Sequence, residues 1–291
     1  MYYIILLLII IIIIFIIFII KYKKEYFKNK KNYLCIQTVF ILNENIKWLD
    51  EYIKYHKNLG VEHFYLYDNE GTTGGDGSTN ENKYGMKIKN FNTNEDKKKL
   101  KKILKKYSDI ITIIKWQPKD KNGNIIYGQN EAISHFKKKF GKYNKWVCLI
   151  DLDEYLFSPK NINLIKFLKS LEKKNISGIK INQKKFKDRF LTNEKYIINE
   201  YNCIDKKIGK EWGAKNIILC NELLNKQTNI HYIKTKKKII DIKNEILRFN
   251  HYNVNEKQLN WMTNFYKLNK KFKLNSIDNS MKRYKYITEN L

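Results

Sequence analysis

Arginine is scarce in this sequence, although the chain is strongly basic. The formal net charge is +28, yet the 57 lysine and arginine residues include only three arginines. Proteins that recognise nucleic-acid phosphates rely heavily on bidentate arginine contacts. The excess of lysine, with abundant asparagine and isoleucine, indicates AT-rich codons instead, so no nucleic acid is expected as a partner. A basic surface would still attract anionic lipid or a nucleotide.

Cysteine is also scarce, and its spacing argues against two kinds of chemistry. Cys35, Cys148, Cys203 and Cys220 form neither a Cys-x-x-Cys pair nor a dense framework. Zinc binding and redox catalysis are therefore not predicted. Cys148 lies within an apolar run and is predicted to be a buried filler. A disulfide between two of the other cysteines stays open.

Two further absences limit the domain organisation and the type of phosphate site. The glycine-rich residues 71–77 lack the Gly-x-x-x-x-Gly-Lys-Ser/Thr and Gly-x-Gly-x-x-Gly spacings, so we interpret this stretch as a surface loop. No linker divides the chain, and 291 residues suffice for one sizeable α/β domain with a membrane anchor. A hydrophobic content of 43% is enough to build a core.

Residues 2–20 carry no charge, in contrast to the rest of the chain. Their length matches the roughly 20 apolar residues that cross a bilayer. No small-residue cleavage site follows, so we predict an uncleaved transmembrane signal anchor over residues 1–20. A basic stem is predicted over residues 21–32.

The pattern after the stem predicts alternating strands and helices. The apolar run Tyr33–Leu42 indicates a strand, helical spacing then continues to Gly60, and residues 61–67 indicate a second strand. This is a βαβ unit, for which a right-handed crossover is expected. Further helices are expected at 97–107, 127–140, 162–171 and 256–272, and further strands at 110–114, 146–150, 177–181, 216–219, 231–233 and 239–242.

The apolar run Trp146–Ile150 ends abruptly in Asp151, Asp153 and Glu154. Such a run is typical of a strand that is covered on both faces, and ligands of α/β sheets collect at the carboxyl ends of the strands. Because side chains alternate along an extended chain, Asp151 and Asp153 are predicted to point the same way. Two carboxylates together suit Mg²⁺ or Mn²⁺, which takes further ligands from substrate phosphates.

Two other interpretations of Asp-x-Asp were weighed. Acidic residues often end strands without any function, so the pair by itself is weak support for a metal. Phosphatases of the haloacid dehalogenase type also carry Asp-x-Asp after a strand, but they have a small Thr or Val where this chain has Tyr155.

The order of several motifs resembles glycosyltransferase family 92. The matching motifs lie within about residues 33–272: Asn43-Glu44, Trp48–His56, Leu59–Asn69, Gln129 with Ala132–His135, Trp146–Leu156, Lys215–Ile218, His231 and Asn250–Tyr252. Each motif alone is weak support for the resemblance, but the shared order is hard to obtain by accident. The segment between Ile181 and Tyr201 is so rich in lysine that no acceptor site aligns.

This resemblance implies a GT-A-like, Rossmann-type mixed sheet flanked by helices over residues 33–272, with a basic tail over residues 273–291. It also implies transfer of a hexose, often galactose, from a nucleotide diphosphate donor such as a UDP-sugar to a glycan or glycoprotein, with inversion. By this resemblance, the residues expected near the nucleotide donor are Asn43, Glu44, Asp68 and Gln129. The residues expected to bind an Mn²⁺ or Mg²⁺ ion are Asp151 and Asp153.

Three further site residues are candidates with less support. His251 is the candidate for an additional metal ligand, with His231 as second choice, whereas His56 and His63 look structural. Glu211, beside Trp212 and Gly213, is the candidate base that deprotonates the acceptor hydroxyl, although a plain surface residue is the alternative. Glu154 is expected to position the donor sugar or to orient the metal ligands.

The sequence leaves the membrane side and two alternative functions open. The lysines after the anchor favour a cytosolic domain by the positive-inside rule, whereas most anchored sugar transferases face the Golgi lumen. We expect a single-pass protein of a Golgi/ER-type or viral-factory membrane. The alternatives are a non-catalytic, membrane-tethered carbohydrate-binding protein and a polybasic protein that binds lipid or nucleic acid.

Overall fold

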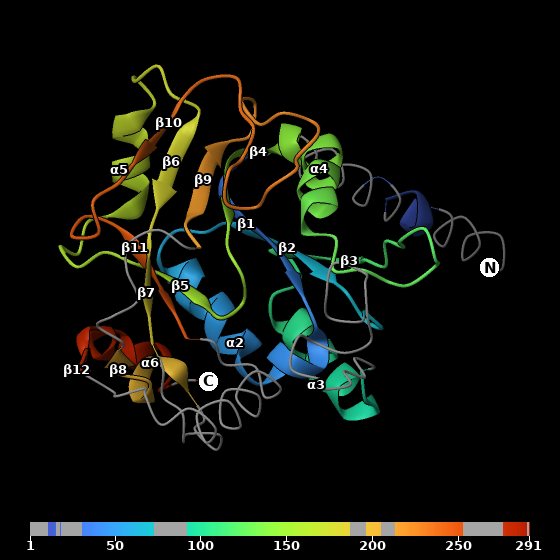
Figure 1. Ribbon diagram of the computed structural model, residues 1–291. Helices are drawn as coiled ribbons and strands as arrows, with labels where there is room; N and C mark the ends of the chain where they lie inside the picture. Colours follow the sequence, from blue (N-terminus) through green and yellow to red (C-terminus); the bar gives the residue numbers. More distant parts are fainter. Residues whose placement is uncertain are drawn as a thin grey trace, which may run out of the picture.

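A seven-stranded mixed sheet forms the centre of the molecule (Figure 1). The computed structural model describes residues 11–15, 18, 31–72, 92–186, 196–204, 213–252, 276–289 and 291. The strand order is β10-β6-β9-β4-β1-β2-β3. Neighbouring strands among β4, β1, β2 and β3 are parallel, whereas β9 runs antiparallel to β4 and to β6. The strand bounds are β1 Asn32–Phe40, β2 His63–Asp68, β3 Ile111–Lys115, β4 Asn144–Leu149, β6 Gly178–Ile181, β9 Lys215–Leu219 and β10 Ile239–Asp241.

Two small sheets lie beside the central one. In the first, β11 (Arg248–His251) pairs antiparallel with β5 (Glu154–Phe157) and parallel with β7 (Gln183–Lys185). In the second, β8 (Cys203–Ile204) pairs antiparallel with β12 (Ser276–Ile277). Because β4 belongs to the large sheet and β5 to the three-stranded one, the residues between them connect the two sheets.

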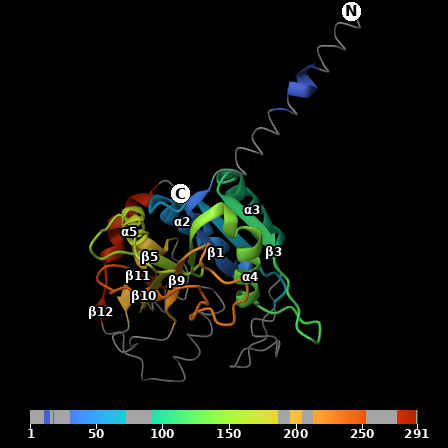
Figure 2. The same ribbon diagram turned by 90° about the horizontal axis from the view of Figure 1, so that it is seen from above.

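Helices cover both faces of the central sheet, which makes its strands apolar on both sides. One face packs against α2 (Leu42–Asn58), α3 (Asn94–Lys106) and α5 (Leu164–Leu171), and the other packs against α4 (Gln129–Lys139). Figure 2 shows β1 between α2 and α4. The remaining elements are η1 (Gly141–Tyr143), α6 (Ile197–Glu200) and η2 (Ser280–Ile287).

The predicted α/β class is confirmed. The structure has a mixed parallel and antiparallel sheet flanked by helices, and its β1-α2-β2 unit lies where the apolar periodicity placed it. The first helix begins at Leu42, which the sequence assigned to the end of the strand. Gly60, with a φ of 97°, follows the end of the helix.

One predicted strand is wrong. Residues 231 and 232 form bends, and residue 233 is in no strand, because the side chain of Asn229 accepts hydrogen bonds from the backbone N–H groups of His231 (2.8 Å) and Tyr232 (3.1 Å). Such a side-chain turn competes with strand pairing. The predicted helix at 256–272 and most of the glycine-rich loop lie outside the described residues.

The last part of the chain contributes to the core. In η2, Met281, Tyr284 and Ile287 are buried in the same apolar cluster as α2. Asp278, just before η2, accepts hydrogen bonds from Lys184 (2.5 Å) and Arg248 (3.0 Å), which fixes the end of the chain to β7 and β11.

The expected membrane anchor falls largely outside the described residues. Of residues 2–20, the structure describes only 11–15 and 18. Within the part of the chain that it does describe, it contains no helix with the length and apolar character needed to span a bilayer.

Candidate active site

The turn between β4 and β5 brings three carboxylates together at the carboxyl end of β4. Leu149, the last residue of β4, is flanked by Gln37 of β1 and Asn216 of β9, so this end of the strand is enclosed on both sides. The backbone N–H of Glu154 donates to the carbonyl of Asp151 (3.1 Å), which closes the turn. The backbone N–H of Asp151 donates in return to Oε2 of Glu154 (2.9 Å). The turn is therefore held by its own acidic side chain.

Lys215 neutralises part of this negative charge. It is the first residue of β9, and because β9 runs antiparallel to β4, its side chain starts beside the end of β4. Its Nζ lies 2.6 Å from Oδ2 of Asp151 and 3.3 Å from Oε2 of Glu154. The residue is only 4% exposed. Burial lowers the pKa of Lys215, but Asp151 and Glu154 raise it more, so the ammonium stays charged.

Glu154 behaves differently from an ordinary surface glutamate. Its pKa is raised to about 7, chiefly by burial. The charge of Lys215 opposes this rise, and the charge of Asp151 adds to it. The side chain is 1% exposed. A carboxyl group so enclosed, and bonded to the backbone of Asp151, is suited to hold the turn in shape.

His251, at the end of β11, faces the same turn from the three-stranded sheet. Its Nε2 lies 3.3 Å from Oδ2 of Asp153, and its Nδ1 lies 2.9 Å from Oε1 of Gln183 on the neighbouring strand β7. Burial lowers the pKa of His251, but Asp153 raises it more, and the net direction is upward. Burial likewise raises the pKa of Asp153, whereas His251 and Lys215 lower it to below its ordinary value.

The arrangement of Asp153 and His251 fits a divalent cation. Because Oε1 of Gln183 can only accept, Nδ1 of His251 carries a proton, and Nε2 is left to face the Asp153 carboxylate. A lone pair opposite a carboxylate is repulsive unless a proton or a metal lies between them. Mg²⁺ and Mn²⁺ sites commonly take one or two protein ligands and fill the rest with water and phosphate oxygens. Within the described residues, no group of three or more His, Cys, Asp or Glu side chains forms a complete protein cage for a metal.

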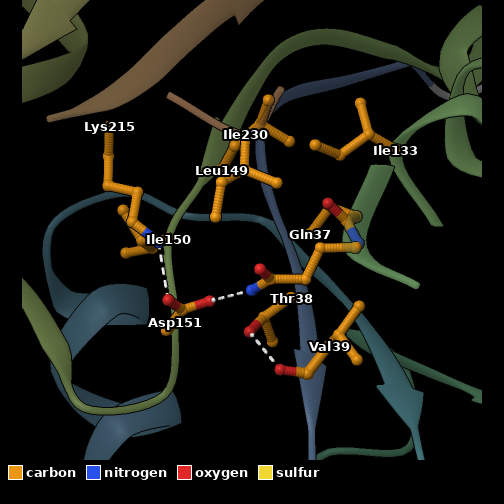
Figure 3. A pocket seen from close by; sticks show the side chains of 10 residues that line it. Gln37, Thr38, Val39, Ile133, Leu149, Ile150, Asp151, Lys215 and Ile230 are labelled. Carbon is orange, nitrogen blue, oxygen red and sulfur yellow. Dashed lines mark hydrogen bonds and ion pairs between the residues drawn. The ribbon is translucent and has the colours of Figure 1, made fainter. Parts of the chain in front are cut away.

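Asp151 is held differently from Asp153. Its Oδ1 accepts a hydrogen bond from Nε2 of Gln129 at the start of α4 (3.0 Å), and its Oδ2 accepts from Lys215. In Figure 3 the carboxylate of Asp151 points from the end of β4 into a pocket beside β1. This pocket is lined by Gln37, Thr38, Val39, Gln129, Ile133, Leu149, Ile150, Asp151, Lys215 and Ile230.

The predicted nucleotide-side residues lie at the ends of β1 and β2. Asn43 and Glu44 are in the first turn of α2 and line a separate hollow between α2 and α3. Asp68 ends β2 beside Phe40 of β1. Burial, and then the nearby Glu70, raise the pKa of Asp68 to about 6. Gln129 is the member of this predicted group that directly contacts the acidic turn.

Tyr127 connects the end of β1 with the acidic turn. Its hydroxyl donates to the carbonyl of Val39 (2.9 Å). Burial raises the pKa of this phenol well above its ordinary value, and the carboxylates of Asp151 and Glu44 raise it further. Since β1 and β4 are parallel neighbours, Glu44, just after β1, and the acidic turn, just after β4, lie at the same edge of the sheet.

Of the remaining candidates, the structure describes His231 and His56 but not Glu211. Nδ1 of His231 lies 2.8 Å from the carbonyl of Ala214, the residue before Lys215. His56 is fully buried between the carbonyl of Tyr52 and the backbone N–H of Leu156, as a structural residue would be. Glu211 lies outside the described residues.

Two polar residues of the site were not predicted from the sequence. Lys215 belongs to one of the motifs shared with the family but had no predicted role, and Gln183 was not among the candidates. The chain is rich in lysine, and the only local signal for Lys215 is its position shortly before the apolar residues Ile217–Leu219. No local pattern indicated Gln183.

The acidic turn, with a buried lysine and a histidine from a second sheet, lies at the carboxyl end of a central strand, the edge at which α/β proteins commonly bind ligands. The sequence matches the family described as Glycosyltransferase family 92 over residues 30–74 and 81–285. The chain therefore belongs to glycosyltransferase family 92. This membership makes it a transferase by class and implies a nucleotide-sugar donor and a glycan acceptor. A search of curated proteins found no match.

Proposed function

We propose that the chain transfers a hexosyl group from a nucleotide diphosphate donor, such as a UDP-sugar, to a hydroxyl of a glycan or glycoprotein. Galactose is the first sugar to test, and the transfer is proposed to invert the anomeric configuration. Family membership supplies the reaction class. The observation that carries the site assignment is the approach of His251 Nε2 to Asp153 Oδ2 at 3.3 Å, at the carboxyl edge of the sheet.

Asp153 and His251 are proposed to hold Mn²⁺ or Mg²⁺. When bound, such an ion neutralises the charge that develops on the departing diphosphate and orients that group. Asp151 is assigned to the donor's hydroxyl groups, because Gln129 and Lys215 fix both of its oxygens in position and leave lone pairs free to accept further hydrogen bonds.

The remaining roles follow from burial. Glu154 is too enclosed to reach an acceptor, so we assign it to shaping the turn and not to proton transfer. Glu211 remains our candidate for the base that takes the proton from the attacking hydroxyl. Asn43, Glu44 and Asp68, at the ends of β1 and β2, are proposed to contact the nucleotide.

The proposal includes the fold type and the location. The topology, with its acidic turn between two sheets, supports a GT-A-like domain. The uncharged residues 2–20 support a single-pass anchor in a Golgi/ER-type or viral-factory membrane.

The test is a donor panel with the full-length chain. Hydrolysis and transfer of UDP- and GDP-sugars are measured with Mn²⁺ and with EDTA, for the wild type and for Asp153→Asn. We expect one donor to be turned over, with a loss of at least about 100-fold in kcat/KM in EDTA and in the variant. Asp109→Asn, the same change at an exposed position, is the matched control and should keep wild-type turnover.

Two outcomes would contradict the proposal. Turnover that survives both EDTA and Asp153→Asn would remove the metal site from the mechanism. No turnover of any donor by folded protein that still binds glycans would favour the tethered carbohydrate-binding alternative.

A further inference from the structure

Gln183 and Gly213 lie next to His251 and contact each other across the junction of the two sheets. Gln183 is on β7 of the three-stranded sheet, and Gly213 lies two residues before β9 of the central sheet. A Cβ atom on Gly213 would lie 2.3 Å from Nε2 and 3.1 Å from Cδ of Gln183. A side chain at position 213 would therefore displace the Gln183 amide from its present place.

Gly213 is also required by its backbone. Its φ of 100° lies in the left-handed region, which side chains other than glycine rarely adopt. The chain thus turns sharply just before Lys215 and presents a bare Cα to the Gln183 amide. The amide nitrogen occupies the space that a Cβ at position 213 would need, and the amide oxygen lies 2.9 Å from Nδ1 of His251.

We propose that Gln183, held in place by Gly213, is a positioning residue that sets the tautomer and ring orientation of His251 for divalent-cation binding. This inference rests on the proposed metal site. Histidine ligands usually donate their second ring N–H to a fixed acceptor, and this bond keeps the other nitrogen free for the metal. Gln183 supplies that acceptor, so Nε2 is the nitrogen presented towards Asp153.

The same contact joins the two halves of the site. Gly213 precedes the strand that begins with Lys215, which binds Asp151 and Glu154. Gln183 holds His251, which faces Asp153. A displacement of Gln183 would therefore alter the metal side of the site while the Lys215 ion pairs stay in place.

The experiment measures Mn²⁺ binding by the full-length protein without any donor, from the electron paramagnetic resonance signal of free Mn²⁺. Gln183→Leu keeps the side-chain bulk but removes the acceptor, and Gly213→Ala pushes the amide away. Both are expected to weaken Mn²⁺ binding by about 10- to 100-fold. Gln183→Glu keeps an acceptor oxygen and should stay within about 10-fold of wild type.

Gly123→Ala is the matched control for Gly213→Ala. Gly123 has a φ of 83°, but a Cβ there would meet nothing within 4 Å. It therefore has a similar backbone cost without the contact, and its Mn²⁺ affinity should equal that of the wild type.

The outcomes separate this inference from the proposed function. Wild-type Mn²⁺ affinity in Gln183→Leu would overturn the role of Gln183 alone. No Mn²⁺ binding by the wild type would overturn the proposed metal site as well.

If Gln183→Leu does not fold, the wild type carries the test. A ¹⁵N spectrum of the Mg²⁺-saturated, histidine-labelled protein reports on five histidines, and the signals lost in His251→Asn identify His251. With the cation and not a proton facing Asp153, His251 is expected to carry its proton on Nδ1, and a proton on Nε2 at saturating Mg²⁺ would refute the proposal.

Discussion

Lys215 is the buried counter-charge of the acidic turn. A buried cation is costly to desolvate, and its presence beside two carboxylates is explained by the still larger cost of leaving those carboxylates alone. Its contacts to Asp151 and Glu154 tie the start of β9 to the end of β4. Removing one member of such a buried group leaves uncompensated charge, whereas removing an exposed pair changes little.

Lys215→Met is therefore expected to lower the free energy of unfolding by about 3 kcal/mol, measured by urea denaturation. Lys180→Met removes the partly exposed ion pair with Asp241 (2.8 Å) and should cost less than about 1 kcal/mol. Asp151→Asn combined with Lys215→Met should recover part of the loss, because the two residues interact directly. Equal effects of Lys215→Met and Lys180→Met would contradict the assignment of Lys215 as a structural counter-charge.

At the scale of elements, the short α6 is held by a carboxylate from a distant helix. Oε2 and Oε1 of Glu51 on α2 accept hydrogen bonds from the backbone N–H groups of Ile197 (2.9 Å) and Ile198 (2.8 Å). These donors have no partner inside the helix, and a negative charge at a helix N-terminus is favourable. Since a helix of one turn is not stable alone, α6 depends on this cap and on the packing of Ile197 and Ile198.

Glu51→Gln removes the charge and one of the two acceptor oxygens, and leaves a buried N–H without a partner. The expected loss is about 2 kcal/mol in the free energy of unfolding. Hydrogen exchange at Ile197 and Ile198 should accelerate at the same time. Glu95→Gln, at an exposed position paired with Lys99, is the control and should change stability by less than about 0.5 kcal/mol. Unchanged exchange at α6 would show that the cap does not hold it.

The sequence predicted the β1-α2-β2 unit and the acidic end of β4 because each depends on local periodicity. It placed Asp151 and Asp153 on an extended chain and pointing the same way, whereas residues 152 and 153 form a turn. Asp151 therefore contacts Gln129 and Lys215, while Asp153 faces His251. Strand β4 reads as an apolar run that stops at Asp151, and α2 shows helical spacing throughout. The second sheet was not predictable in this way, since β5 and β11 have four residues each and β7 has three. The pairing of His251 with Gln183 depends on this sheet, so the proximity of His251 to Asp153 had to come from tertiary structure or from family resemblance.

At the scale of the whole molecule, buried ionisable groups make the stability depend on pH in opposite directions. Burial lowers the pKa of His56 to about 3 and that of His63 to about 4. The unfolded chain then binds more protons below about pH 6.5, so these histidines reduce stability as the pH falls. The pKa values of Glu154 and Asp68 are raised, to about 7 and about 6, and these groups have the opposite effect on stability. Their contribution to the free energy of unfolding is complete at low pH and is lost as the pH rises. In the wild type, the change of the free energy of unfolding with pH is therefore the sum of opposing contributions. The contribution of one group is isolated by comparing the wild type with a variant that lacks it.

His56→Gln isolates the largest histidine contribution. At pH 7.5 the variant is expected to be less stable than the wild type, because it disturbs the hydrogen bonds with Tyr52 and Leu156. On going to pH 5, the wild type loses about 2 kcal/mol through His56, and the variant does not, so the difference should shrink by that amount. Urea unfolding at both pH values measures it. Ile53→Val, an uncharged change in the same helix, should cost about 1 kcal/mol at either pH. A His56→Gln deficit as constant as that of Ile53→Val would mean that His56 becomes protonated inside the folded protein, and the buried, neutral state of its ring would have to be abandoned.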